Sequence, residues 1–215
     1  MPSNSDYKFS NNWFVHSAKA IWDQIIPQLN PRKILEIGSY EGASTCYLIE
    51  KLGHQQDIEL HCIDTWAGGI EHQGTDMAAV EQNFWANINL ALAKVSHRVD
   101  LVVHKGFSVV HKGFSDLKLA ELLTQGKRNY FDFIYVDGSH QAPDVLCDAI
   151  LSFRLLRKFG LLAFDDYLWH EHLPYGVDPL RCPKPAIDAF TNLYCRQLRI
   201  VSAPLYQVYI QKISD

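Results

Sequence analysis

Residues 33–44 read Lys-Ile-Leu-Glu-Ile-Gly-Ser-Tyr-Glu-Gly-Ala-Ser, and this stretch decides the fold. Residues 33–37 are a short apolar run that predicts a buried strand, and residues 43–52 have the spacing of an amphipathic helix. The glycines between them suit a turn in which the backbone approaches a ligand closely. A strand that leads directly into a helix is typical of the repeating unit of a parallel sheet.

The same alternation continues along the chain. Further strands are predicted at 58–63, 99–103, 131–136 and 161–164, and further helices at 14–29, 77–95, 117–124 and 142–158. The last two strands, 198–202 and 206–212, are joined by only three residues, which is too short for a crossover helix and therefore predicts an antiparallel hairpin. The sequence thus predicts an α/β fold with a doubly wound seven-stranded sheet, mostly parallel, with an antiparallel C-terminal hairpin strand.

The length of 215 residues fits one domain with decorations. We expect a single domain over 1–215, with an N-terminal helical extension at 1–30 and an acceptor-binding loop at 168–185 that is rich in proline and aromatic residues. The heptapeptide Val-Val-His-Lys-Gly-Phe-Ser occurs twice in tandem, at 102–108 and 109–115. Only one copy can form the third strand, and the first is favoured because it completes an alternating stretch.

Composition argues against several classes of protein. The net charge is −4 and the chain has no long run of lysine and arginine, so we expect no nucleic-acid partner. Five cysteines without a CxxC pair fit reduced thiols in the cytoplasm better than disulfides or a zinc site. We find no signal peptide in the polar N-terminus and no apolar run of roughly 20 residues, so we expect no membrane association.

Polar residues cluster where the predicted parallel strands end, which is where open α/β sheets bind ligands. The first loop, 38–44, does not fit the dinucleotide fingerprint GxGxxG, because Tyr40 and Ala43 replace two of its glycines. This disfavours a nicotinamide-dependent oxidoreductase but leaves room for a smaller anion, such as an amino-acid carboxylate, at the helix N-terminus. Asp64, which ends the second strand, is suited to accept both hydroxyls of a ribose. Its plainer interpretation is a helix cap.

Taken together, these motifs resemble class I S-adenosylmethionine-dependent methyltransferases. ILEIGSYEGAS and HCIDTW are similar to the first two motifs of small-molecule O-methyltransferases of the catechol and caffeoyl-CoA type. FDFIYVDGSH and GLLAFDDY resemble a bacterial group that includes the macrocin-like sugar O-methyltransferases. The resemblance covers roughly residues 13–212 and implies a Rossmann-like fold. It also implies an enzyme that methylates a hydroxyl of a small molecule, such as a sugar or a catechol-like compound.

The resemblance also implies roles for individual residues. S-adenosylmethionine would be bound by the ends of the first four strands: Glu36, Gly38, Ser39, Tyr40, Gly42, Ser44, Asp64, Thr65, Trp66, Ser108 or Ser115, and Asp137. Magnesium would be held by Asp137, Asp165 and Asp166, which supply hard oxygen ligands. His140 occupies the position of the catalytic lysine of the catechol-type enzymes and is the expected general base. The plainer interpretation is that these aspartates cap helices and turns and that His140 is structural.

Two questions stay open at this level. A non-catalytic module that only binds S-adenosylmethionine is the main alternative to an enzyme, because the fold does not determine the acceptor. The aromatic N-terminal helix has three possible roles: covering the cofactor, covering the acceptor, or packing against a second copy of the chain in a homodimer.

Overall fold

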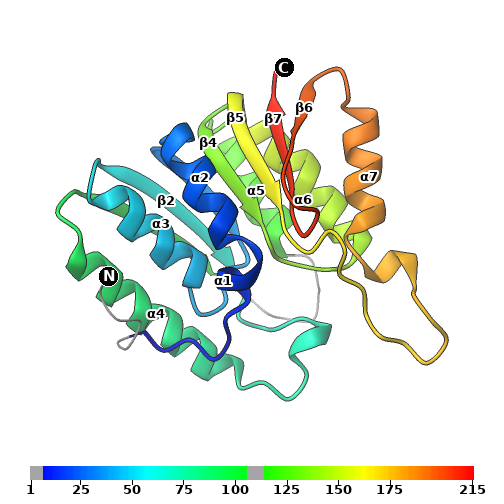
Figure 1. Cartoon of the computed structure of the whole chain (residues 1–215), viewed down its shortest axis with the longest axis horizontal. Helices are drawn as coiled ribbons and strands as arrows, with labels where there is room; N and C mark the ends of the chain where they lie inside the picture. The colour runs from blue at the N-terminus through cyan, green and yellow to red at the C-terminus, as the bar shows by residue number, and fades with distance from the viewer. Residues whose placement is uncertain (1–6, 106–113) are drawn as a thin grey trace.

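The computed structural model describes residues 7–105 and 114–215 (Figure 1). Its helices and strands follow one another in the order α1 Trp13–Ser17, α2 Lys19–Leu29, β1 Lys33–Ile37, α3 Ala43–Gly53, β2 Ile58–Asp64, η1 Ile70–His72, α4 Met77–Lys94, β3 Val99–Lys105, α5 Phe114–Thr124, β4 Phe131–Val136, α6 Ala142–Leu155, β5 Leu156–Phe164, η2 Pro179–Arg181, α7 Lys184–Leu193, β6 Leu198–Val201 and β7 Val208–Lys212.

The strands form one seven-stranded sheet in the order β3-β2-β1-β4-β5-β7-β6. The first five strands of the chain pair in parallel, whereas β7 runs antiparallel to both of its neighbours, β5 and β6. The predicted mostly parallel sheet with an antiparallel hairpin strand is therefore confirmed. Because β1, β2, β4 and β5 are parallel, their carboxyl ends meet at one edge of the sheet, and the loops of that edge carry the predicted site.

Two hydrophobic cores lie on opposite faces of the sheet. One core packs β1, β2 and β4 against α2, α3 and α4, and the other packs the sheet against α5, α6 and α7. Figure 1 shows the two helical layers with the sheet between them. Strands β1 and β4 lie between these cores and are buried along almost their whole length, which explains their continuous apolar sequences.

The predicted helix 142–158 is three residues too long. Helix α6 ends at Leu155 and β5 begins at Leu156. The backbone becomes extended at Leu156, and the Lys212 ammonium, from the far end of the chain, donates to the carbonyls of Phe153 in α6 and Leu156 in β5, at 3.2 and 3.0 Å. A local sequence pattern does not contain that partner.

The predicted helix 14–29 is divided at Ala18 into α1 and α2. The third strand includes residues 102–105, so the first copy of the heptapeptide continues the strand, as expected. The remainder of that copy and most of the second lie outside the described residues, whereas Ser115 lies in the first turn of α5. None of the helices in the described part of the chain is long and apolar enough to cross a membrane.

Candidate active site

The loop after β1 is shaped by left-handed backbone at three alternate positions, Gly38, Tyr40 and Gly42, with φ of 83°, 48° and 81°. Gly38 is also forced to be glycine by its neighbour: a Cβ there would lie 1.9 Å from the carbonyl oxygen of Asp137. The loop after β1 and the loop after β4 therefore touch through their backbones.

Glu36 is a buried carboxylate beneath this loop. Its oxygens accept hydrogen bonds from the hydroxyls of Ser39 (2.7 Å), Ser44 (2.5 Å) and Thr45. Burial raises the pKa of Glu36, and these donors oppose the shift. Glu36 thus connects the loop to the first turn of α3 by hydrogen bonds. Because the Ser44 hydroxyl donates its proton to Glu36, it cannot donate the same proton to a ligand.

Asp64 extends from the end of β2 to the same loop. One carboxylate oxygen accepts from the backbone N–H groups of Ser39 and Tyr40, at 2.8 and 2.9 Å, and the other accepts from the N–H of Trp66 at 2.7 Å. The Trp66 indole in turn donates to the Tyr40 carbonyl at 2.9 Å and packs on Phe84. Asp64 and Trp66 therefore fix the conformation of the loop, and the carboxylate oxygen that accepts from Trp66 retains acceptor capacity.

Glu41, which sequence analysis did not single out, attaches the N-terminal segment to this edge. Its buried carboxylate accepts from the backbone and the hydroxyl of Ser10, at 2.6 and 2.9 Å, and from the side chain of Asn83 at 2.8 Å. The segment leads into α1, where Trp13 is 58% exposed and lies 5.5 Å, ring centre to ring centre, from Tyr40. The beginning of the chain thus lies beside the first loop.

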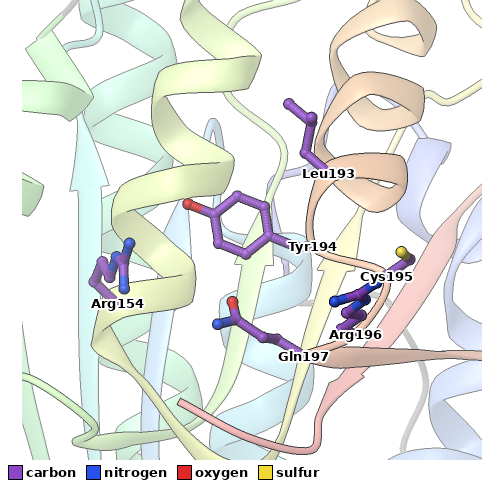
Figure 2. Close-up of a pocket in the computed structure, with 6 residues that line it drawn as sticks. All are labelled: Arg154, Leu193, Tyr194, Cys195, Arg196 and Gln197. Atoms are coloured by element: carbon purple, nitrogen blue, oxygen red, sulfur yellow. The ribbon is translucent and has the colours of Figure 1, made fainter.

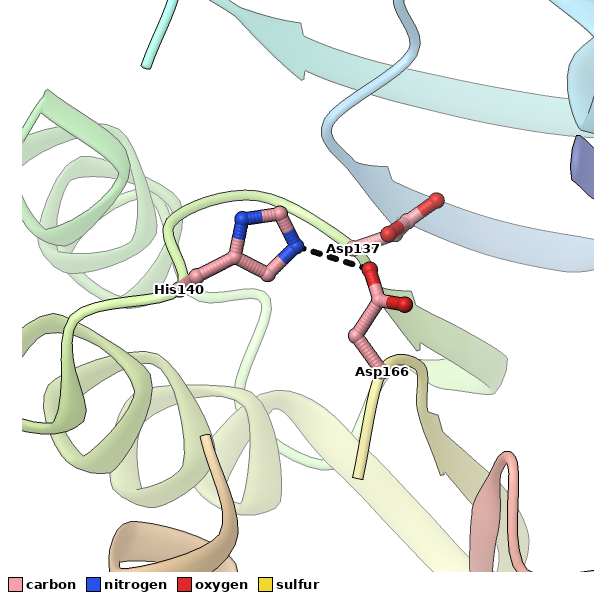
Figure 3. Close-up of side chains that lie close together, drawn as sticks. All are labelled: Asp137, His140 and Asp166. Atoms are coloured by element: carbon pink, nitrogen blue, oxygen red, sulfur yellow. Dashed lines mark hydrogen bonds and ion pairs between the residues drawn. The ribbon is translucent and has the colours of Figure 1, made fainter. Parts of the chain in front are cut away.

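The second part of the site follows β4 and β5. Asp137, His140 and Asp166 each place one ligand atom within 4.8 Å of the others. Figure 3 shows these three side chains together, with the contact between His140 and Asp166 dashed. Nε2 of His140 lies 2.7 Å from Oδ2 of Asp166, and the imidazole stacks on Trp169 with ring centres 4.3 Å apart. Two carboxylates and an imidazole are a donor set that fits a divalent cation.

Asp165 is arranged differently from its neighbour Asp166. Its carboxylate accepts from the hydroxyl of Tyr135, from the amide of Gln207 at 2.8 Å and from the N–H of Asp166 at 2.8 Å. The Tyr135 hydroxyl also lies 3.0 Å from Asp137. Asp165 therefore lies outside the group of three ligand atoms, although it lines the same small cavity as Asp137, His140 and Asp166.

The accumulated negative charge affects the acid–base behaviour of these groups. Burial raises the pKa of Asp137 well above its usual range, and the charges of Asp165 and Asp166 raise it further. Burial, and then the charge of Asp166, raise the pKa of Asp165 to about 6. A cation at this position would offset the repulsion.

Other predicted residues have more local surroundings. The Thr65 hydroxyl accepts from the N–H of Ala67 at 3.1 Å, and Ser115 lies beside the buried Asp148. Ser108 lies outside the described residues. In the predicted acceptor loop, the Glu171 carboxylate pairs with Arg181 at 2.6 Å.

One cavity lies away from this edge of the sheet. It has a volume of about 500 Å³ and is formed by the last turn of α6 and the segment between α7 and β6 (Figure 2), lined by Arg154, Leu193, Tyr194, Cys195, Arg196 and Gln197. Because β6 begins directly after it and runs parallel to β5, the cavity is at the opposite edge of the sheet. Its two arginines lie near the C-terminal ends of α6 and α7, where positive charge is favourable without any ligand.

Comparison of the sequence with known proteins places the chain in a family. A protein-family model described as a methyltransferase domain matches residues 35–167, which include both parts of the site. A probable caffeoyl-CoA O-methyltransferase of Dictyostelium discoideum is 26% identical over 169 residues, 79% of this chain, and a second from the same organism is 27% identical over the same length. The chain spans 61% of the length of each of these relatives.

Solved structures share the fold. The O-methyltransferase from Bacillus cereus in complex with SAH (S-adenosylhomocysteine) superposes with a TM-score of 0.56 at 17% identity, over 89% of this chain and 79% of that one. TomG from Streptomyces achromogenes, an O-methyltransferase involved in tomaymycin synthesis and solved with SAM (S-adenosylmethionine), gives 0.57 at 16% identity, over 91% and 78%.

Proposed function

Because the chain belongs to the methyltransferase-domain family, we propose that it transfers a methyl group from S-adenosylmethionine to a hydroxyl of a small molecule, with the help of a divalent cation. The two solved neighbours named above are described as complexes with this cofactor or with its demethylated product. The two Dictyostelium relatives are described as O-methyltransferases.

The observation that supports this proposal best is the backbone contact between Gly38 and Asp137. It joins the loop proposed to bind the cofactor to the group proposed to bind the cation and the acceptor. In methyl transfer the acceptor oxygen, the methyl carbon and the leaving sulfur must be in line, so the two binding regions have to adjoin.

For the cofactor, we propose that Asp64 accepts the ribose hydroxyls and that Gly38 and Gly42 allow close approach of the methionine part. The Tyr40 hydroxyl has no hydrogen-bond partner among the described residues and is suited to donate to the cofactor carboxylate. Ser44 is less suited, because its proton is donated to Glu36. Glu36, Ser39, Thr65, Trp66 and either Ser108 or Ser115 complete the proposed surroundings.

For the acceptor, a cation held at this edge would lower the pKa of a hydroxyl and orient it towards the methyl group. Asp137 and Asp166 are the oxygen ligands proposed here, and magnesium is the ion expected from the family resemblance. The loop 168–185 is the proposed acceptor-binding segment, because Trp169 packs on His140 and because Tyr175 is 75% exposed. A single domain, a cytoplasmic location and association into a homodimer stay predictions.

Calorimetric titration with S-adenosylhomocysteine, once with Mg²⁺ and once with EDTA, tests the proposal. We expect micromolar binding that Asp64→Asn weakens at least about tenfold, since the variant loses a charged acceptor for the ribose. Asp100→Asn is the matched control, because Asp100 is exposed on β3 and pairs with the exposed Arg98 at 2.7 Å. No binding in either buffer would refute the cofactor assignment.

A second measurement separates an enzyme from a binding module. Labelled S-adenosylmethionine is incubated with a panel of catechols, hydroxycinnamoyl thioesters and sugars, with and without Mg²⁺. Transfer to any of them supports catalysis. Binding of the cofactor without transfer to any acceptor would favour the non-catalytic module instead.

A further inference from the structure

The three ligand atoms that meet after β4 and β5 are not of one kind. Asp137 and Asp166 offer carboxylate oxygens, whereas His140 offers an imidazole nitrogen within 4.8 Å of both. Magnesium prefers oxygen ligands alone, and a nitrogen ligand favours first-row transition ions. The donor set therefore bears on which cation binds.

A third carboxylate would restore an all-oxygen set, and Asp165 is the residue that sequence analysis assigned to it. Asp165 is only 9% exposed, and its oxygens already accept from Tyr135, Gln207 and the N–H of Asp166. Asp165 brings no ligand atom into the group formed by Asp137, His140 and Asp166, and turning its carboxylate towards them would break its hydrogen bonds with the buried Tyr135 and Gln207.

The hydrogen bonds of Asp165 continue as a chain through the core. Gln207 accepts from the hydroxyl of Tyr209, and the indole of Trp22 in α2 donates to that hydroxyl oxygen at 2.9 Å. Trp22, Tyr209 and Gln207 are all at most 1% exposed. A buried polar chain with every member paired specifies one geometry, because moving one group leaves another unsatisfied.

We propose that Asp137, His140 and Asp166 bind a divalent first-row transition ion, such as Mn²⁺, Co²⁺ or Zn²⁺, in preference to Mg²⁺. His140 is then a ligand and Asp165 is not. This inference rests on the proposed function, since the same cation would assist transfer, but it concerns the identity of the ion and its ligands.

The proposal also changes the role of His140. The sequence predicts a general base, and a base needs a free ring nitrogen that faces the acceptor. Nδ1 of His140 is buried, and Nε2 faces Asp166 at 2.7 Å. Nε2 cannot hold a cation and accept a proton at the same time. The stacked Trp169 keeps the ring in this orientation, 4.3 Å between centres, which suits a ligand.

Electron paramagnetic resonance of the intact protein with Mn²⁺ tests the proposal directly. Mn²⁺ is the weakest binder of the transition series, so it gives the strictest comparison with Mg²⁺. We expect Mn²⁺ to bind about tenfold more tightly than Mg²⁺ in competition, with a ¹⁴N hyperfine coupling in the pulsed spectrum. His140→Ala should remove the coupling and weaken Mn²⁺ binding at least about tenfold.

Two matched variants complete the test. Asp165→Asn should keep the ¹⁴N coupling and weaken Mn²⁺ binding less than Asp166→Asn does. His170→Ala, which removes a histidine from the neighbouring loop, should change neither the affinity nor the spectrum. Circular dichroism of each variant verifies that it is folded.

Three results would overturn the inference: no ¹⁴N coupling in the wild-type protein, Mg²⁺ affinity equal to or above that of Mn²⁺, or Asp165→Asn as damaging as Asp166→Asn. Calorimetry with S-adenosylhomocysteine on the same samples keeps the two proposals apart. Binding of that ligand without the expected Mn²⁺ behaviour refutes only the cation assignment, whereas loss of ligand binding in the wild-type protein refutes the proposed function.

Discussion

Replacing Gly38 with alanine should destabilise the protein and disable cofactor binding. The new Cβ would lie 1.9 Å from the carbonyl oxygen of Asp137, whereas a tight carbon–oxygen contact needs about 3.3 Å. The loops after β1 and β4 would have to separate by roughly 1.4 Å, the difference between these two distances. Such overpacking costs about 1–3 kcal/mol, and the left-handed φ of 83° adds about 1–2 kcal/mol.

Gly126 provides the matched control. Its φ of 81° is almost the same, but a Cβ there would meet nothing within 4 Å. Gly126→Ala should therefore lose only the backbone contribution, about 1–2 kcal/mol, and leave affinity for S-adenosylhomocysteine unchanged. Urea unfolding and calorimetry on both variants measure the two effects. Equal stability and equal ligand affinity of the two variants would show that the backbone contact between the loops does not matter.

Three further predictions concern buried charges. Burial raises the pKa of Asp148 to about 7, against about 3.9 in the unfolded chain. The stability of the wild-type protein should therefore fall as pH rises between these two values. Asp148→Asn should abolish this fall and be more stable than the wild type by up to about 4 kcal/mol at pH 8, as measured by urea unfolding. Burial and the adjacent His61 lower the pKa of His104 to about 4, so the neutral imidazole contributes stability that is present above pH 6.5 and lost as pH drops towards 4. His104→Gln should therefore lose less thermal stability than the wild type between pH 7 and pH 5. An unchanged pH dependence of the melting temperature would contradict this. Lys212→Met should lower the free energy of unfolding in urea by about 2–4 kcal/mol, because it leaves the carbonyls of Phe153 and Leu156 without their donor. A decrease below about 1 kcal/mol would mean that water replaces the ammonium as the donor.

Much of the fold could be predicted because burial on both faces leaves a clear pattern. The apolar runs of β1 and β4 have the expected bounds. The predicted three-residue link between the last two strands is six residues long in the structure, 202–207, because β6 ends and β7 begins inside the predicted bounds, but it is still too short for a crossover helix and the antiparallel pairing is confirmed. The end of α6 was missed because Leu155 and Leu156 are both buried and nothing local separates them. Lys212, which donates to the carbonyl of Leu156 at that boundary, is more than fifty residues away in sequence.

For the site, too, some features could be predicted from local sequence, whereas others depend on residues that are distant in the sequence. The polar residues at the strand ends could be found because parallel strands finish at one edge. Partners across the sheet could not: His140 meets Asp166, and Gln207 meets Asp165, through tertiary packing alone. Tyr135 was overlooked although a signal existed, because alternation in β4 places its side chain on the same face as that of Asp137.

Asp165 and Asp166 illustrate why equal residues in a motif need not have equal roles. Successive side chains of an extended segment point to opposite sides, so two adjacent aspartates after β5 are not expected to converge on one ion. Here the left-handed φ of 55° at Asp166 turns its carboxylate to His140, while Asp165 stays with the buried chain that leads to Trp22. The N-terminal helix α2 is thereby connected to the site through side chains.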